Sequence, residues 1–374
     1  MKYIFIILCS VFSICQSQTR NMEYTYDFLD DETKPIYEFW KDYVSLMSEG
    51  NPNAKSKWKS NDKDYLVTLS GYTPTLYQMN TYNKLLYIRK IDDDKFELAS
   101  MFYWIQDDEN LNIISVVKYI IQKEDSKLFL KNYLNYSTQN WVKQKIGFIE
   151  YYYPENYNFN LKKAKSANKT IGNLNKLFDL NNETIKYYIP EDCDNQSLII
   201  GLDYLPTKGL MKQCGYFDTK NNIVLATSFS GEDYKHELIH LINKKYPNAY
   251  YLLLTGLSVY HSSNNANLGK SSKEVLKIFN NFLKENEVEL SFTSNFPKIN
   301  NEIGTEYVIG NILIDTILEK GDLYLLKYTL ENITNKEQLT SFIKDQLHIV
   351  DEDSFIRMKA IEMQSDNYKF RILL

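Results

Sequence analysis

The chain has 374 residues, with 43 Lys and Arg against 48 Asp and Glu, and its formal net charge is −5. This length suggests two or three domains and allows a sizeable core. A hydrophobic fraction of 44% excludes wholesale disorder, and only 13 Gly and 8 Pro exclude a collagen-like or linker-dominated chain. The mildly negative net charge gives no sign of the excess of basic residues that nucleic-acid binding needs, so we expect no nucleic-acid partner.

The N-terminus has the pattern of an export signal. Lys2 precedes an apolar run at residues 3–15, which is too short for a comfortable membrane span and fits a signal-peptide core. Cys15 and Ser17 are small residues suited to a cut before Gln18, so residues 1–17 are a predicted signal peptide; a lipoprotein cut at Cys15 is the alternative. No later apolar run approaches the length of a span, so we expect an exported protein (periplasmic, cell-surface or secreted) with no transmembrane span in the mature chain.

Two cysteines, Cys193 and Cys214, remain after removal of the signal. In an exported chain they can pair, and a bond closing the 20-residue loop between them would contribute about 3 kcal/mol in the chain-entropy model. Two separate buried thiols are the alternative. No CxxC spacing is present, so we do not expect either cysteine to bind a metal.

Residues 18–150 are predicted to form a first domain of α+β class, with one helix and a curved antiparallel sheet. The helix covers residues 34–48, where apolar residues recur at helical spacing: Ile36, Trp40, Tyr43, Val44 and Met47. Aromatic and β-branched runs at 84–91 and 96–104 flank three aspartates and predict a hairpin. A second hairpin is predicted for 113–122 and 128–136.

Residues 151–374 are predicted to form the second domain, which begins after Tyr151-Tyr-Tyr-Pro154. The first predicted helix carries apolar residues on one face: Ala164, Ala167, Ile171, Leu174 and Phe178. Strands are predicted at 184–189 and 222–227. Further helices are predicted at 234–243, 251–260, around 275–282, and at 304–319, 323–332 and 336–347.

The motif that carries chemistry is His236-Glu237-Leu238-Ile239-His240, an HExxH pattern. Residues four apart share one face of a helix, so both imidazoles can point at one metal ion. Glu237 then lies beside the metal, placed to take a proton from a bound water. With 4 His in the chain, the chance of this short pattern arising anywhere is about 0.003. A surface helix with two incidental histidines is the alternative.

Residues 150–335 resemble the gluzincin metallopeptidases, which share the thermolysin-like HExxH helix. The segment at 222–227 falls where those enzymes carry the edge strand that pairs with substrate. Leu254-Thr255-Gly256-Leu257-Ser258-Val259-Tyr260 is similar to the family segment that supplies a glutamate as third zinc ligand. Tyr307-Val308-Ile309-Gly310 resembles a family segment whose tyrosine helps to hold the oxyanion. The resemblance therefore implies a zincin-like domain, Zn²⁺ as cofactor, His236 and His240 as ligands, and catalytic roles for Glu237 and Tyr307.

Thr255 departs from the family pattern, because the third ligand should be a glutamate. A catalytic zinc site needs three protein ligands and a water, so Thr255 leaves a doubtful third-ligand position. The site then binds metal weakly or not at all, or another side chain completes it, or the assignment of this helix is shifted. His261, Glu302 and Glu306 are the candidates for a substitute ligand.

We therefore expect an exported zinc metallopeptidase-like protein, or a degenerate form of one, that hydrolyses peptide bonds in a peptide or protein substrate. The alternative is a catalytically inactive zincin-fold scaffold that binds a peptide or a cell-envelope protein. A carbohydrate-binding protein that uses the Tyr-rich N-terminal part is a third hypothesis, resting on the 31 Tyr alone.

Overall fold

The structure is a computed structural model. It describes residues 28–59, 76–79, 81–106, 110–181, 183–206, 208–210, 214–261, 271–294, 296–299 and 303–371. The predicted signal peptide lies outside these residues. The chain divides into two compact units, one formed by residues up to 141 with 192–212, and the other by 142–191 with 213–374. The boundary thus lies before the predicted position near residue 150, and a short later segment returns to the first unit.

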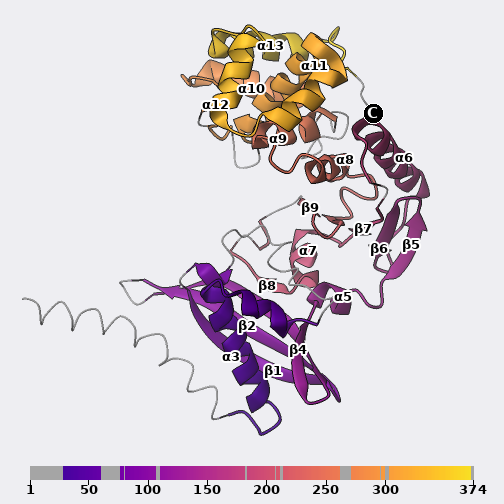
Figure 1. Ribbon diagram of the computed structural model, residues 1–374, viewed down its shortest axis with the longest axis vertical. Coiled ribbons are helices and arrows are strands. Elements are labelled where there is room, and N and C mark those ends of the chain that lie inside the picture. The colour runs from indigo at the N-terminus through magenta and orange to yellow at the C-terminus, as the bar shows by residue number, and fades with distance from the viewer. Residues whose placement is uncertain are drawn as a thin grey trace, which may run out of the picture. The chain divides into compact units, whose positions relative to one another are not determined.

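The first unit is built on an antiparallel sheet (Figure 1), as predicted. Its strands are β1 (Tyr82–Asp92), β2 (Lys95–Ile105), β3 (Leu111–Glu124) and β4 (Lys127–Lys131), in the order β1-β2-β3-β4, and β8 (Leu202–Tyr204) also pairs with β3. Both predicted hairpins are present. The last strand ends at Lys131 rather than at 136, because the Asn132 side chain caps the short helix α5 (Tyr133–Ser137).

Helix α3 (Lys34–Ser48) belongs to the same unit and has the predicted bounds. It buries Ile36, Tyr37, Trp40 and Tyr43. The Trp40 and Tyr119 ring centroids are 5.1 Å apart, and the Trp40 Nε1–H group donates a hydrogen bond to Ser100 Oγ over 3.2 Å. Aromatic packing of this kind against the sheet supplies the core of the unit. The shorter helices η1 (Pro52–Lys57), η2 (Leu76–Gln78) and α7 (Cys193–Ile199) complete its described part.

The second unit contains a mixed sheet with the strand order β5-β6-β7-β10-β9. The strands are β5 (Val142–Ile146), β6 (Ile149–Tyr153), β7 (Ile185–Tyr188), β10 (Ile223–Ala226) and β9 (Gly215–Asp218). Helix α6 (Leu161–Phe178) buries all five of its predicted core residues. The segment at 222–227 was expected to be the edge strand, and this was wrong. It forms β10, which pairs in parallel with β7 and antiparallel with β9, so the edge strand is β9.

The rest of the second unit is helical. Its elements are α8 (Lys235–Ile239), η3 (His240–Lys244), α9 (Tyr251–His261), α10 (Ser272–Glu285), α11 (Thr305–Asn332), α12 (Lys336–Asp345) and α13 (Glu352–Gln364). Two predicted helices, at 304–319 and 323–332, are the two parts of α11, which breaks at Gly321 and at Asp322 (φ +52°). The sequence did not predict α13. The α+β class is confirmed.

Cys193 and Cys214 are both disulfide-bonded. They are the two cysteines among the described residues, which agrees with the predicted pairing. Within the described ranges, none of the helices combines the length and the apolar character needed to cross a bilayer.

Candidate metal centre

The HExxH segment folds as one turn of α-helix that passes into a 3₁₀ turn at His240. The predicted continuous helix at 234–243 is therefore split. Leu238, Ile239, Leu241 and Ile242 are buried, as the apolar pattern predicted, and they fix the segment against the core of the second unit. The two histidines stay on one side despite the change of helix type, because His240 is the first residue after the α-helical turn.

The His236 and His240 rings lie close together, with their centroids 5.1 Å apart and their planes at 83°. Imidazoles that bind one tetrahedral zinc ion through bonds of about 2.0–2.1 Å have ring centroids about 5 Å apart. Asn243 Nδ2 lies 3.2 Å from His240 Nδ1. Metal binding through Nε2 requires the tautomer in which Nδ1–H donates, and exchanging the amide oxygen and nitrogen of Asn243 supplies the acceptor for that hydrogen bond. The spacing of the rings therefore fits a shared metal ion.

Both imidazoles are held in the neutral form that binds metals. Burial lowers the pKa of His236 to about 3, and the neighbouring His240 lowers it further. Burial also lowers the pKa of His240 to about 4, against a smaller opposing effect of Asn243. Since a metal must displace a proton from a charged imidazole, neutral rings present their lone pairs without that cost.

Glu237 lies with its side chain against the edge strand β9. Its side chain is buried, and burial raises its pKa to about 8, while a hydrogen bond from the Phe217 backbone N–H lowers it. A Cβ atom at Gly215 would lie 2.2 Å from the Tyr234 ring and 3.0 Å from Glu237 Oε1. A side chain at position 215 would therefore collide with the Tyr234 ring and crowd the Glu237 carboxyl group. A buried carboxyl group with a pKa near neutrality has the proton affinity that a general base needs.

Helices α9 and α11 carry the other two predicted site residues, Thr255 and Tyr307. They approach at two glycines, because a Cβ atom at Gly256 would lie 2.3 Å from the carbonyl oxygen of Gly310. Helix α9 also packs against α8. Thr255 is half-buried and directly precedes Gly256, and Tyr307 is half-buried one turn before Gly310. The two segments that the resemblance singled out are thus in contact.

Tyr307 is electrostatically coupled to the HExxH acid. Burial raises the pKa of its phenol, and Glu306 and then Glu237 raise it further by their negative charge. The hydroxyl group therefore keeps its proton at neutral pH and can donate a hydrogen bond. This is the protonation state that stabilisation of an oxyanion requires.

The structure does not bring the proposed substitute ligands to the histidine pair. Among the described residues, no group of three or more His, Cys, Asp and Glu side chains is arranged to hold a metal ion. His261 ends α9 with its Nε2 buried and without a hydrogen-bond partner, and its charged neighbour is Lys235. Glu306 lies in the first turn of α11, and Glu302 is outside the described residues. The site therefore offers two imidazoles and an acid, one ligand short of a full catalytic set.

Sequence reasoning missed three parts of the site: the edge strand β9, Gly215 beside Glu237, and the contact between Gly256 and Gly310. Four residues in β9 are too few to show an alternating pattern. The two glycines were visible in the segments that resemble gluzincins, although their contact depends on the helix register.

Comparisons with known proteins assign no family to the chain. Neither a scan against protein-family models nor a search of curated proteins finds a match. The chemistry of the side chains around His236 and His240 is therefore the basis for a functional conclusion.

Proposed function

We propose that the chain is an exported protein whose second unit is a metallopeptidase-like module. This module binds zinc through His236 and His240 and hydrolyses peptide bonds. The observation that carries this proposal is the 5.1 Å separation of two neutral imidazoles, the buried His236 and the half-buried His240, in a segment whose acid, Glu237, is also buried. Incidental histidines on a surface helix would be solvated and would not converge. The zincin-like arrangement is part of the proposal, supported by the contact of α9 with both α8 and α11.

The chain's own groups have distinct tasks in this proposal. Zinc, when bound, supplies Lewis acidity and lowers the pKa of a water molecule. Glu237 takes the proton of the attacking water and can pass it to the leaving amine. The Tyr307 hydroxyl donates a hydrogen bond to the developing oxyanion. Asn243 holds the His240 ring in orientation through Nδ1.

Export is supported by the signal-like N-terminus and by the disulfide-bonded state of Cys193 and Cys214. Disulfides persist in oxidising compartments and are rare in reducing ones. A peptide or protein substrate follows from the reaction class.

The second candidate function is a catalytically inactive zincin-fold scaffold that binds a peptide or a cell-envelope protein. It is favoured by one observation: Thr255 stands at the third-ligand position, and no described third ligand replaces it. Under this alternative the histidine pair would bind zinc weakly and the buried carboxyl group would not turn over substrate.

Casein digestion by the zinc-loaded chain separates the two candidates. The enzyme proposal predicts activity that Glu237→Gln lowers by at least about a hundredfold, within the range of general-base contributions. Glu285→Gln, at the exposed C-terminal end of α10, is the matched control and should leave activity unchanged. Absence of activity in the wild type, with activity appearing in Thr255→Glu, would establish the scaffold instead.

A further inference from the structure

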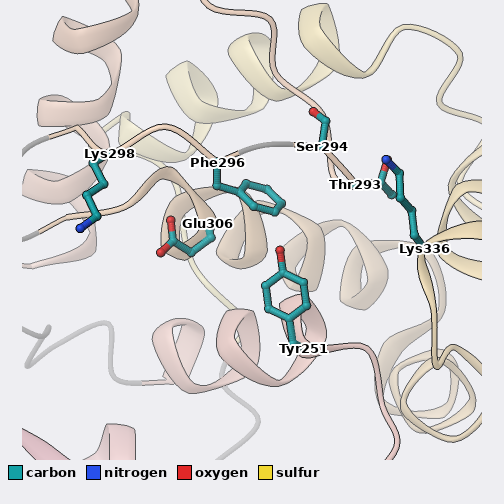
Figure 2. A pocket seen from close by; sticks show the side chains of 7 residues that line it. All are labelled: Tyr251, Thr293, Ser294, Phe296, Lys298, Glu306 and Lys336. Carbon is teal, nitrogen blue, oxygen red and sulfur yellow. The ribbon is translucent and has the colours of Figure 1, made fainter. Parts of the chain in front are cut away.

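A cavity of about 580 Å³ lies at the start of α9 and α11, outside the metal centre. It is lined by Tyr251, Thr293, Ser294, Phe296, Lys298, Glu306 and Lys336, shown in Figure 2, and is called the Tyr251 pocket below. A volume of this size holds one or two amino-acid residues and lies within the range of ligand pockets. The three hydroxyl groups and three charged groups make it a polar pocket with an aromatic centre.

The charges of the Tyr251 pocket are unequal, with two ammonium groups against one carboxylate. Figure 2 shows Lys298 and Glu306 on one side of the Phe296 ring and Lys336 on the other. No salt bridge of either lysine is found within the described ranges. The negative charge of Glu306 thus offsets the positive charge of Lys298 on the same side of the pocket. On the Lys336 side, no carboxylate is among the residues that line the pocket. The positive excess is therefore located at Lys336.

An aromatic surface separates the two charged sides. The Tyr251 and Phe296 ring centroids are 6.2 Å apart at 82°, an edge-to-face contact. Thr293 and Ser294 add hydroxyl donors to the pocket lining. Methylene groups of a ligand can pack on the rings while a carboxylate receives hydrogen bonds from an ammonium and a hydroxyl group.

The Tyr251 pocket is linked to the candidate metal centre through Tyr307, because Glu306 of the pocket and Glu237 of the HExxH segment both raise the pKa of its phenol. Tyr251 precedes Thr255 by four residues on α9, so the two share one helix face about 6 Å apart along the axis. Glu306 directly precedes Tyr307 on α11. Because an extended peptide advances about 3.3–3.6 Å per residue, a chain lying at the metal centre can place a side chain one or two positions along into the pocket.

We propose that the Tyr251 pocket binds an acidic side chain of the peptide ligand, with its carboxylate at Lys336 and its methylenes against Tyr251 and Phe296. The inference rests on the proposed function for the peptide nature of the ligand. It holds equally for a substrate and for a peptide bound by an inactive scaffold. A basic side chain directed to Glu306 is the opposing outcome.

The test uses three short fluorescein-labelled Ala-Ser peptides that differ only in their central residue, which is Glu, Gln or Lys. Fluorescence anisotropy measures their binding to the chain without residues 1–17, with zinc and with a chelator. We expect the Glu peptide to bind about tenfold more tightly than the Gln peptide, the effect of one charge-assisted hydrogen bond. Lys336→Gln should abolish this preference. Lys344→Gln, on the same helix but outside the pocket, should retain it.

Each outcome decides the inference separately from the proposed function. A preference for Glu that Lys336→Gln removes supports the pocket, even when no peptide is hydrolysed. Equal binding of the three peptides, a preference for Lys, a failure of all three to bind, or a Glu preference that survives in Lys336→Gln overturns it. Hydrolysis without acid preference would overturn the pocket while leaving the peptidase proposal intact.

Discussion

Replacement of Gly256 by alanine should separate the two helices that carry Thr255 and Tyr307. The added Cβ atom would lie 2.3 Å from the Gly310 carbonyl oxygen and 2.5 Å from its carbonyl carbon. Both are backbone atoms, which cannot rotate away as a side chain does. Overpacking costs about 1–3 kcal/mol, and the backbone contact places Gly256→Ala at the upper end, about 3 kcal/mol. Alanine gains about 1 kcal/mol over glycine in a helix interior, so the net destabilisation is about 2 kcal/mol.

Urea denaturation followed by circular dichroism measures this effect, with Gly172→Ala as the matched control. Gly172 lies inside helix α6, where an added Cβ atom would meet only Phe148 Cε2 at 3.6 Å, an ordinary contact. Gly172→Ala should therefore be neutral or stabilising by up to about 1 kcal/mol. An unfolding midpoint of Gly256→Ala at or above that of the wild type would refute the close approach of α9 and α11.

Two further predictions concern buried charge. At pH values between 4.5, the ordinary pKa of Glu237, and its raised pKa of about 8, the folded chain keeps a proton on Glu237 and the unfolded chain releases it. The wild type therefore loses stability as the pH rises through this window. With a chelator present, Glu237→Gln should be more stable than wild type by about 4 kcal/mol at pH 8 and nearly equal at pH 4 in urea titrations. A difference independent of pH would contradict the burial of the carboxyl group. Lys359 Nζ lies 3.4 Å from the buried carboxylate of Asp315, so Lys359→Met should destabilise by about 3–5 kcal/mol in thermal unfolding. Adding Asp315→Asn should recover part of that loss, and no recovery would show that lost packing, not unpaired charge, is the cause.

Elements with a strong apolar period were predictable from the sequence. The predicted core residues of α6 are all buried, and Ile36, Trp40 and Tyr43 of α3 are buried as well. The hairpin turn at Asp92–Asp94 was readable because charged residues interrupt two runs of β-forming residues. In these segments, local pattern and tertiary packing agree.

Elements that depend on tertiary context were not predictable. Helix α13 buries Ile356, Ala360 and Met363 at helical spacing, but the exposed Met358 and Ile361 blur its apolar face. The shift from α to 3₁₀ geometry at His240 has no local signal, since the surrounding apolar residues fit either helix type. The order of β9 and β10 in the sheet likewise could not be predicted from the residue pattern, because strand pairing depends on contacts between distant segments.

The candidate site divides in the same way. HExxH spacing predicted that His236 and His240 converge, and the 5.1 Å ring separation agrees with that prediction. Spacing could not predict that Glu237 would be buried against Phe217, because β9 is too short to be recognised. The sequence also could not show whether His261 completes the site. Its position at the end of α9 and its neighbour Lys235 depend on how α8 meets α9.

Zinc binding by the purified chain without residues 1–17 tests the central claim most directly. Isothermal titration and X-ray absorption should show one zinc ion per chain with imidazole nitrogens at about 2.0–2.1 Å. His240→Ala should lose this binding, whereas His348→Ala, at an exposed position outside the HExxH segment, should keep it. Absence of zinc binding at millimolar concentration, or binding of equal strength in His240→Ala, would contradict a metal centre formed by His236 and His240.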